Sequence, residues 1–302
     1  MPGSRLPLRP LIALAAGLLL GGCSKFDYLP DAPVEGWSPT VVLMHRGGGH
    51  DCGPGLSCMP NTLPAVLHGF ETLDGAEVDI QITADKTLWL GHDNETLDCA
   101  GNQIGCFQDL SDAQIDAVAY CDGGQPCAAG SSETCIQHYV RVDEVFQAIS
   151  GLQPEKLISL DIKGQYCRSI GVEEAKHMAN EVDRLVRLHQ LDGRVLAETS
   201  QLNFLDGVVD KRTPLYSFVV SLGDVDAPLG AAHERGATGI SFKYAPGSER
   251  MDASVVAGIH GTGKRVILWT INEDQDLLDT WAAAPDVIET DRPDFFDVVG
   301  PP

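Results

Sequence analysis

The stretch AEVDIQIT, residues 76–83, alternates apolar residues with acidic and other polar ones. Such alternation is typical of a β-strand, in which side chains two positions apart point to the same face. Glu77 and Asp79 therefore share one face of the predicted strand. The stretch LISLDIK, which ends at Lys163, repeats this arrangement with Asp161 two positions earlier. The sequence thus predicts two strands that each present a pair of charged side chains on one face.

Further short runs rich in Val, Ile and Leu recur along the chain. With the two strands above they give eight candidates: 40–45, 76–83, 156–163, 194–200, 215–221, 238–244, 265–272 and 286–290. Segments with helical periodicity separate most of them, most clearly residues 173–190. Eight βα units predict a (β/α)8 TIM barrel. The alternative is an open doubly wound sheet, but no GxGxxG motif follows the first strand.

Residues 93–140 interrupt this alternation. They hold five of the nine cysteines and show little apolar periodicity. A further short strand at 88–92 leads into them, and a helix at 141–150 leads out. We therefore expect a cysteine-rich insertion after the second strand region, stabilised by local disulfides whose pairing the sequence does not give. Cys52 and Cys58, in the first loop, are expected to form another bridge.

The charge balance limits the classes of partner. The chain has 43 acidic and 21 basic residues, a net charge of −22. A nucleic-acid backbone would be repelled over most of such a surface, so we expect no nucleic-acid binding. An anionic ligand would need a local cluster of positive charge.

The N-terminal residues predict export. Arg5 and Arg9 precede an uncharged run at 11–20 that is too short to span a bilayer but has the length of a signal-peptide core. The run ends in LGGC, residues 20–23, which resembles a bacterial lipobox. This resemblance implies that Cys23 becomes the lipid-modified mature N-terminus. The alternative is an ordinary secretory signal with Cys23 free or disulfide-bonded.

We therefore expect three parts along the chain: a signal peptide at 1–22, a proline-containing tether at 23–39 and the barrel at 40–300. The mature protein would be a bacterial lipoprotein, anchored to a membrane on the periplasmic or cell-surface side. In such an oxidising compartment, the remaining cysteines would form disulfides.

The ends of two predicted strands carry histidines. His45 and Arg46 end the first strand and precede three glycines at 47–49, and His92 ends the short strand. Imidazole titrates near neutral pH, so a pair of histidines supplies a general acid and a general base. We expect His45 and His92 to be catalytic, with His50 as the reserve candidate.

Three carboxylates are expected to converge near these histidines. Glu77, Asp79 and Asp161 would repel one another at a barrel mouth unless a cation lay among them. An all-oxygen set suits Ca²⁺ or Mg²⁺ better than Zn²⁺. The sequence therefore predicts one divalent cation held by these three residues.

Other strand ends supply candidates for substrate contacts. Arg46 and Lys163 are expected to bind an anionic substrate, and Trp269 could form an apolar wall for it. Lys243 and Glu198 also end strands, and either could line the same pocket.

These residues together resemble the glycerophosphodiester phosphodiesterase family. The matching motifs, in chain order, are His45-Arg46-Gly47, Asn61-Thr62-Leu63, Glu77 with Asp79, His92-Asp93, Asp161 with Lys163, Trp269-Thr270-Ile271-Asn272 and Thr290-Asp291-Arg292-Pro293. Two positions depart from the family pattern. Asp161 stands where the family has glutamate, and Pro60 replaces a glutamate that would accompany Arg46.

The resemblance implies a TIM-barrel phosphoric diester hydrolase that converts glycerophosphodiesters to sn-glycerol 3-phosphate and an alcohol. One alternative is a related enzyme acting on lipids, of the lysophospholipase D or phosphoinositide phospholipase C type. A second is a catalytically inactive surface lipoprotein that binds phosphodiesters or a host protein. The histidine pair argues against the second, because a binding module needs no acid and base.

Overall fold

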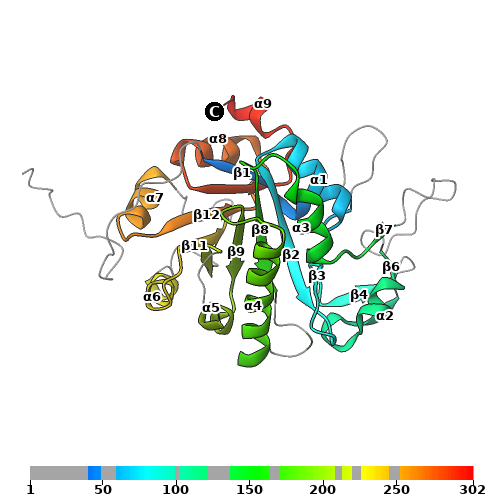
Figure 1. Cartoon of the computed structure of the whole chain (residues 1–302). Coiled ribbons are helices and arrows are strands. Elements are labelled where there is room, and N and C mark those ends of the chain that lie inside the picture. Colours follow the sequence, from blue (N-terminus) through cyan, green and yellow to red (C-terminus); the bar gives the residue numbers. More distant parts are fainter. Residues whose placement is uncertain are drawn as a thin grey trace, which may run out of the picture.

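Eight parallel strands close into a barrel (Figure 1). The computed structural model describes residues 40–48, 59–98, 102–120, 137–163, 167, 170–207, 213–219, 226–244 and 252–301. The predicted lipidation residue Cys23, the reserve candidate His50 and the expected Cys52–Cys58 bridge lie outside these residues.

The barrel strands follow one another in sequence order around the ring. They are β1 (Val41–Met44), β2 (Gly75–Ile82), β8 (Leu157–Ile162), β9 (Val195–Thr199), β10 (Leu215–Val219), β11 (Gly239–Lys243), β12 (Arg265–Trp269) and β13 (Val287–Thr290). β1 pairs with both β13 and β2, which closes the ring. All eight predicted strands are thus confirmed, and the predicted TIM barrel is correct.

Helices cover the outside of the barrel. They are α1 (Leu63–Thr72), α3 (Val142–Ser150), α4 (Val172–Leu188), α5 (Leu202–Gly207), α6 (Asp226–Glu234), α7 (Ala253–His260), α8 (Asp274–Ala283) and α9 (Phe295–Val299). Their apolar faces pack on the outward side chains of the strands, which form the main core. Among the described residues, no helix combines the length and the apolar character needed to cross a membrane.

The inside of the barrel changes from apolar to polar along the strands. Leu43, Leu196, Tyr216, Ile267 and Val287 form an apolar cluster from five different strands. Two positions after Leu43, Leu196, Ile267 and Val287, on the same face because the side-chain period in a strand is two, come His45, Glu198, Trp269 and Glu289, each with a polar group. The apolar layer therefore closes the barrel beneath a polar mouth at the carboxyl ends of the strands.

The segment between β2 and α3 forms a small lobe beside the barrel, at the right in Figure 1. It comprises β3 (Leu88–Leu90), antiparallel to β2, then β4 (Glu95–Leu97), β5 (Gln103–Cys106), the 3-10 turn η2 (Phe107–Asp109), α2 (Asp112–Asp116), β6 (Ala119–Tyr120) and β7 (Gln137–His138). The lobe has an apolar core of its own, formed by Trp89, Phe107, Leu110, Ile115, Val118 and Tyr139. Burial therefore contributes to its stability more than the sequence suggested.

A disulfide joins this lobe to the barrel. Cys106 at the end of β5 is bonded to Cys167, which lies 61 residues away in the loop between β8 and α4. The expectation of local bridges within 93–140 is wrong for Cys106, because its partner lies outside the lobe. Within the lobe, Asp112 at the start of α2 accepts hydrogen bonds from Thr83, Thr87 and Trp89, which ties α2 to β3 and to the turn before it.

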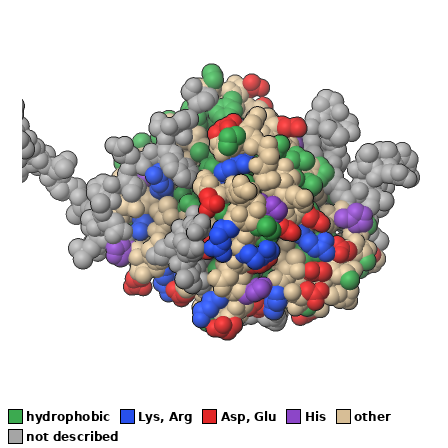
Figure 2. Space-filling model, viewed as in Figure 1, with side chains coloured by type: hydrophobic (Ala, Val, Ile, Leu, Met, Phe, Trp, Pro, Cys, Tyr) green, Lys and Arg blue, Asp and Glu red, His purple; other side chains and the backbone are tan. Residues whose placement is uncertain are grey.

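Charged side chains of both signs are interspersed over the described surface on the face shown in Figure 2. Acidic groups alternate there with Lys and Arg side chains, without a continuous basic stripe of the kind that follows a phosphate backbone.

Candidate active site

A cavity of about 320 Å³ opens at the carboxyl ends of the barrel strands. It is lined by His45, Arg46, Glu77, His92, Asp161, Lys163, Glu198, Lys243, Trp269 and Glu289. All but one of the sequence-predicted catalytic, metal-binding and substrate-binding residues in the described part of the chain thus face one space. The exception is Asp79, which lies just behind this lining.

Three carboxylates form the most acidic part of the site. Glu77, Asp79 and Asp161 each place one oxygen within 4.8 Å of the oxygens of the other two. Glu77 and Asp79 come from β2, and Asp161 comes from the neighbouring strand β8, directly opposite Asp79 in the register. Glu77 and Asp79 are almost fully buried. This small all-oxygen set has the composition expected for a hard divalent cation.

Asp79 is held from three sides. Its Oδ2 accepts a hydrogen bond of 2.7 Å from Asn61 Nδ2 and lies 3.3 Å from Arg46 Nε, while its Oδ1 lies 2.9 Å from Lys163 Nζ. Lys163 also donates to Asp161 Oδ2, so its ammonium group bridges the two aspartates. Despite the replacement by Pro60, Arg46 has an acidic partner, which is Asp79.

The pKa values of the three carboxyls reflect this arrangement. Burial alone would raise the pKa of Asp79, but Lys163 and Arg46 lower it to about 2. Burial raises the pKa of Asp161 to about 7, with Asp79 adding to the effect and Lys163 opposing it. Burial and the repulsion of Asp79 and Asp161 raise the pKa of Glu77 well above its usual value. Burial and mutual repulsion therefore oppose the ionisation of Glu77 and Asp161, while Asp79 stays ionised beside Lys163 and Arg46.

His45 lies at the edge of this cluster. Its Nδ1 is 2.8 Å from Asp291 Oδ1, and its Nε2 is 4.0 Å from Glu77 Oε2. Asn272 Nδ2 donates to the other oxygen of Asp291, at 2.7 Å. The hydrogen bond from His45 lowers the pKa of Asp291 even though burial opposes this. An ionised Asp291 holds the proton of His45 on Nδ1 and leaves Nε2 available on the side of the carboxylates.

His92 lies in the lobe, in the turn that follows β3. Its Nδ1 lies 2.8 Å from Asp93 Oδ1, and its side chain is 40% exposed, against 16% for His45. Gln81 Nε2 donates to the backbone oxygens of His92 and Asp93, which ties this turn to β2. The two histidines therefore have similar aspartate partners, but His92 is closer to solvent.

The turn after β1 packs tightly against α1. Arg46 adopts a left-handed backbone conformation, with φ 55°, and its N–H donates to Glu77 Oε2 at 2.8 Å. At Gly47, with φ 77°, a Cβ atom would lie 2.7 Å from the backbone of Ala65 and Val66. Gly47 is therefore required by this close approach, which fixes the position of Arg46.

Two further carboxyls line the cavity, Glu198 from β9 and Glu289 from β13. Glu198 accepts hydrogen bonds from Ser159 Oγ, at 2.9 Å, and from Ser241 Oγ. Trp269 Nε1 in turn donates to Ser241 Oγ at 2.8 Å. Glu289 on β13 is only 2% exposed, and burial together with Glu198 and Glu77 raises its pKa well above the usual value.

The sequence reasoning placed Glu198 among possible lining residues but did not single out Glu289 or the contact between Asp291 and His45. The period of two puts Glu289 on the same face as Val287, just as Glu198 shares a face with Leu196, but apolar residues on both faces of β13 conceal which one points inward. Asn61, Asn272 and Asp291 occur in the quoted motifs, but only the folded chain shows that they hold Asp79 and His45.

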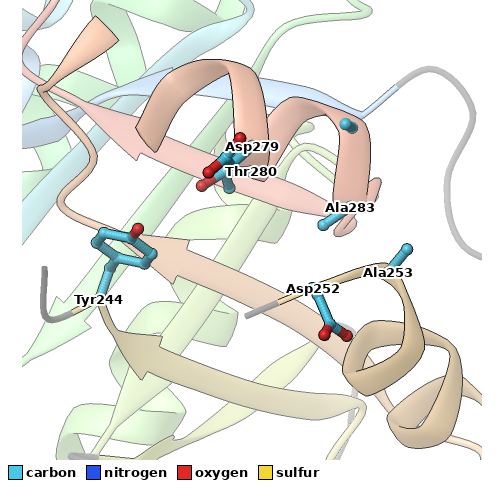
Figure 3. A pocket seen from close by; sticks show the side chains of 7 residues that line it. Tyr244, Asp252, Ala253, Asp279, Thr280 and Ala283 are labelled. Atoms are coloured by element: carbon cyan, nitrogen blue, oxygen red, sulfur yellow. The ribbon is translucent and has the colours of Figure 1, made fainter. Parts of the chain in front are cut away.

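A second cavity, of about 260 Å³, lies where the end of β11 meets α7 and α8 (Figure 3). Its lining includes Tyr244, Asp252, Asp279, Thr280 and three alanines. No histidine, lysine or arginine is among its described lining residues. It therefore lacks the acid, base and positive charge that distinguish the cavity at the barrel mouth.

The similar solved structures have the same fold. A Silicibacter pomeroyi protein assigned as a glycerophosphoryl diester phosphodiesterase is 19% identical, with a TM-score of 0.67, covering 86% of this chain and 93% of its own. An Oleispira antarctica phosphodiesterase in complex with the product sn-glycerol-3-phosphate is 15% identical, with a TM-score of 0.67, covering 86% of this chain and 96% of its own. A glycerophosphodiester phosphodiesterase from Thermotoga maritima is 16% identical, with a TM-score of 0.61, covering 85% and 97%.

None of the curated proteins compared with this chain matches it. A comparison with protein families gives a match to the "Glycerophosphoryl diester phosphodiesterase family" over residues 45–295. That range spans the barrel from His45 at the end of β1 to the start of α9. The chain therefore belongs to the glycerophosphoryl diester phosphodiesterase family, whose members are phosphoric diester hydrolases.

Proposed function

We propose that this chain hydrolyses glycerophosphodiesters to sn-glycerol 3-phosphate and an alcohol, in a reaction that requires a divalent cation. The observation that carries this proposal is the single cavity that joins two histidines, Arg46 and Lys163 to the three-carboxylate cluster. The family match supports the reaction class. The sn-glycerol-3-phosphate in the Oleispira antarctica phosphodiesterase supports the identity of the product.

The cluster of Glu77, Asp79 and Asp161 fits Ca²⁺ or Mg²⁺. Its oxygens lie close together, and repulsion between the carboxylates adds to burial in raising the pKa values of Glu77 and Asp161. Carboxylate oxygens are the ligands that both ions prefer. A divalent cation bound there would supply positive charge that stabilises the negative charge on the phosphoryl oxygens.

The protein's own groups complete the reaction. Arg46 and Lys163 attract and orient the phosphodiester, since both are positively charged and line the cavity. One histidine accepts the proton of the attacking hydroxyl, and the other donates a proton to the leaving alcohol. The attacking group is either water or the 2-hydroxyl of the substrate's own glycerol, and the second route passes through a cyclic phosphate.

We also propose that the enzyme acts outside the cytoplasm as a lipoprotein anchored through Cys23. The support is the sequence of residues 1–23, in which a short apolar run ends in LGGC. Two or more acyl chains on one residue anchor a protein stably, because each buried methylene contributes about 0.8 kcal/mol.

Assays of the purified protein with glycerophosphocholine and lysophosphatidylcholine test this proposal. We expect sn-glycerol 3-phosphate from glycerophosphocholine in the presence of Ca²⁺ or Mg²⁺, and its loss after treatment with EDTA. Preferential cleavage of lysophosphatidylcholine would instead identify a lipid phosphodiesterase. The absence of hydrolysis of either substrate with both cations supplied would favour a binding protein without activity.

A further inference from the structure

Glu289 is a buried carboxyl that faces the cavity without a matching donor. Its side chain is 2% exposed and lines the space at the barrel mouth. No hydrogen-bond donor in the described part of the chain reaches its Oε1. Leaving a buried acceptor unsatisfied costs free energy, so a ligand that displaces water from this part of the cavity has to donate a hydrogen bond in its place.

The carboxyl next to it cannot supply that donor. Glu289 is in hydrogen-bonding contact with Glu198. Both oxygens of Glu198 already accept hydrogen bonds, from Ser159 and from Ser241. Even if the two carboxyls share one proton, the pair has more acceptor positions than donors. The pair therefore keeps at least one acceptor position, Glu289 Oε1, without a donor among the described residues.

Three kinds of partner could satisfy the pair. A metal cation would coordinate it, whereas an ammonium group or a hydroxyl group would donate a hydrogen bond to it. A second cation is disfavoured, because the described residues contain only one group of three closely spaced metal-ligating side chains, and neither Glu198 nor Glu289 is in it. An ammonium group on the ligand is disfavoured, because Lys243 already brings a positive charge to this cavity. Its Nζ lies over the Trp269 ring, 5.9 Å from the ring centroid. An uncharged hydroxyl group avoids both difficulties.

The neighbouring Trp269 agrees with a hydroxyl-bearing ligand. It lines the same cavity and is fixed by its hydrogen bond to Ser241, which also holds Glu198. An aromatic ring beside a carboxyl offers an apolar surface to C–H groups and an acceptor to O–H groups. A short polyol such as glycerol has both kinds of group.

We infer that Glu289, with Glu198 and Trp269, forms a subsite that accepts hydrogen bonds from the hydroxyl groups of the substrate's glycerol moiety. This inference rests on the proposed function, and it assigns Glu289 a role in selecting polyol phosphodiesters over diesters of simple alcohols. A site built to pair with a hydroxyl discriminates strongly against an analogue that lacks it.

The test compares two ligands that differ only in hydroxyl groups, sn-glycerol 3-phosphate and propyl phosphate. Their dissociation constants are measured by calorimetry in buffer with Mg²⁺, for wild type, Glu289→Met, Glu289→Gln and the control Glu155→Met. Glu155 is an exposed residue just before β8, at the opposite end of the barrel. Thermal melting checks that each variant is folded.

We expect wild type and Glu155→Met to prefer sn-glycerol 3-phosphate. In Glu289→Met this preference should fall by about tenfold, the effect of one hydrogen bond to a buried carboxyl, while the affinity for propyl phosphate changes little. Glu289→Gln keeps a carbonyl acceptor and should lose part of the preference. If Glu289→Met does not fold, a reduced preference in Glu289→Gln still supports the subsite, and an unchanged preference overturns it.

An equal loss of affinity for both ligands, or an unchanged preference in Glu289→Met, would overturn the subsite. Turnover of glycerophosphocholine by wild type is measured separately. If wild type turns over glycerophosphocholine but does not prefer sn-glycerol 3-phosphate to propyl phosphate, only the subsite is overturned. If that preference is present and depends on Glu289 but there is no turnover, only the proposed function is overturned.

Discussion

At the scale of single residues, the site depends on aspartates that hold histidines. Asp291 and Asp93 each lie 2.8 Å from Nδ1 of their histidine, which leaves both Nε2 atoms to exchange protons. Asp291 is in turn fixed by Asn272. The proposed acid and base therefore have defined orientations before a substrate binds, which is what proton transfer in the transition state requires.

His45→Ala and His92→Ala should each lower kcat by at least about a hundredfold, because general acid–base groups contribute 10²–10⁴-fold. Neither change should alter stability much, since both side chains face the cavity. His177→Ala is the matched control, because His177 bonds only the backbone oxygen of Lys86 on the outside of the barrel. Steady-state kinetics of folded variants measure the effect, and near-normal turnover would remove the altered histidine from the mechanism.

Asp291→Asn should lower kcat by about a hundredfold or more with little change in KM, since an amide can donate to Nδ1 and so favour the wrong tautomer of His45. Asp291 acts here as a positioning residue. The exposed Asp297→Asn in α9 is the control with the same chemical change. If KM rises and kcat is unaffected, Asp291 contacts the substrate and does not orient the histidine.

Asp161 is the position where this chain departs from the family's glutamate. Asp161→Asn removes one of three negative charges and should raise the cation concentration needed for half-maximal activity, with less effect on the rate at saturation. Asp161→Glu extends the side chain by about 1.5 Å and should be tolerated. Activity titrated with Ca²⁺ and with Mg²⁺ measures both. An unchanged cation requirement in Asp161→Asn would show that Glu77 and Asp79 suffice.

At the scale of elements, strands were more predictable than the contacts between them. The alternation in AEVDIQIT placed Glu77 and Asp79 correctly, because polar residues mark the inward face there. In β13 the sequence Val-Ile-Glu-Thr has apolar residues on both faces, so the inward face of Val287 and Glu289 appears only when the barrel closes. The Cys106–Cys167 bridge was unpredictable for a similar reason, since it joins segments that only the fold brings together.

The disulfide connects the lobe to the site. His92 lies in the lobe, directly after β3, and Cys167 follows Lys163 by four residues, so the bond fixes the lobe next to the β8–α4 loop. Close by, Gly91 packs against the ring of Phe107, where an added Cβ would lie 2.8 Å from the ring. The lobe and its bridge therefore bear on the position of His92.

Cys106→Ser with Cys167→Ser should lower the free energy of unfolding by about 2–4 kcal/mol, because the bridge closes a long loop in the unfolded chain. kcat should fall as well, through looser positioning of His92. Thermal unfolding with and without reductant, together with kinetics, tests both effects. Reductant should lower the melting temperature of the wild type at least as much as the double substitution does, because it also breaks any other disulfides. Equal melting temperatures for the oxidised wild type and the variant would show that the apolar core of the lobe suffices.

At the scale of the whole molecule, a strongly acidic chain surrounds a site for an anionic substrate. The net charge is −22, so long-range attraction does not favour a phosphodiester, and Arg46, Lys163 and Lys243 supply positive charge only at the cavity. This arrangement suits small, mobile substrates, which can reach the cavity with little hindrance. It suits an anionic membrane surface less well, because the acidic body would be repelled from it.

Attachment to a membrane would therefore depend on the N-terminal lipid. Cys23→Ala should yield a protein that is neither lipidated nor cleaved between Gly22 and Cys23, because the modified residue also defines the cleavage site. Partitioning into detergent that is due to acyl chains should disappear, while glycerophosphocholine turnover by the purified protein should remain, since the barrel strands begin at Val41. Phase partitioning and mass spectrometry of the N-terminus measure these outcomes. If the wild type and the variant both yield the same mature protein beginning at another residue, the leader is an ordinary secretory signal and the enzyme is exported without an anchor.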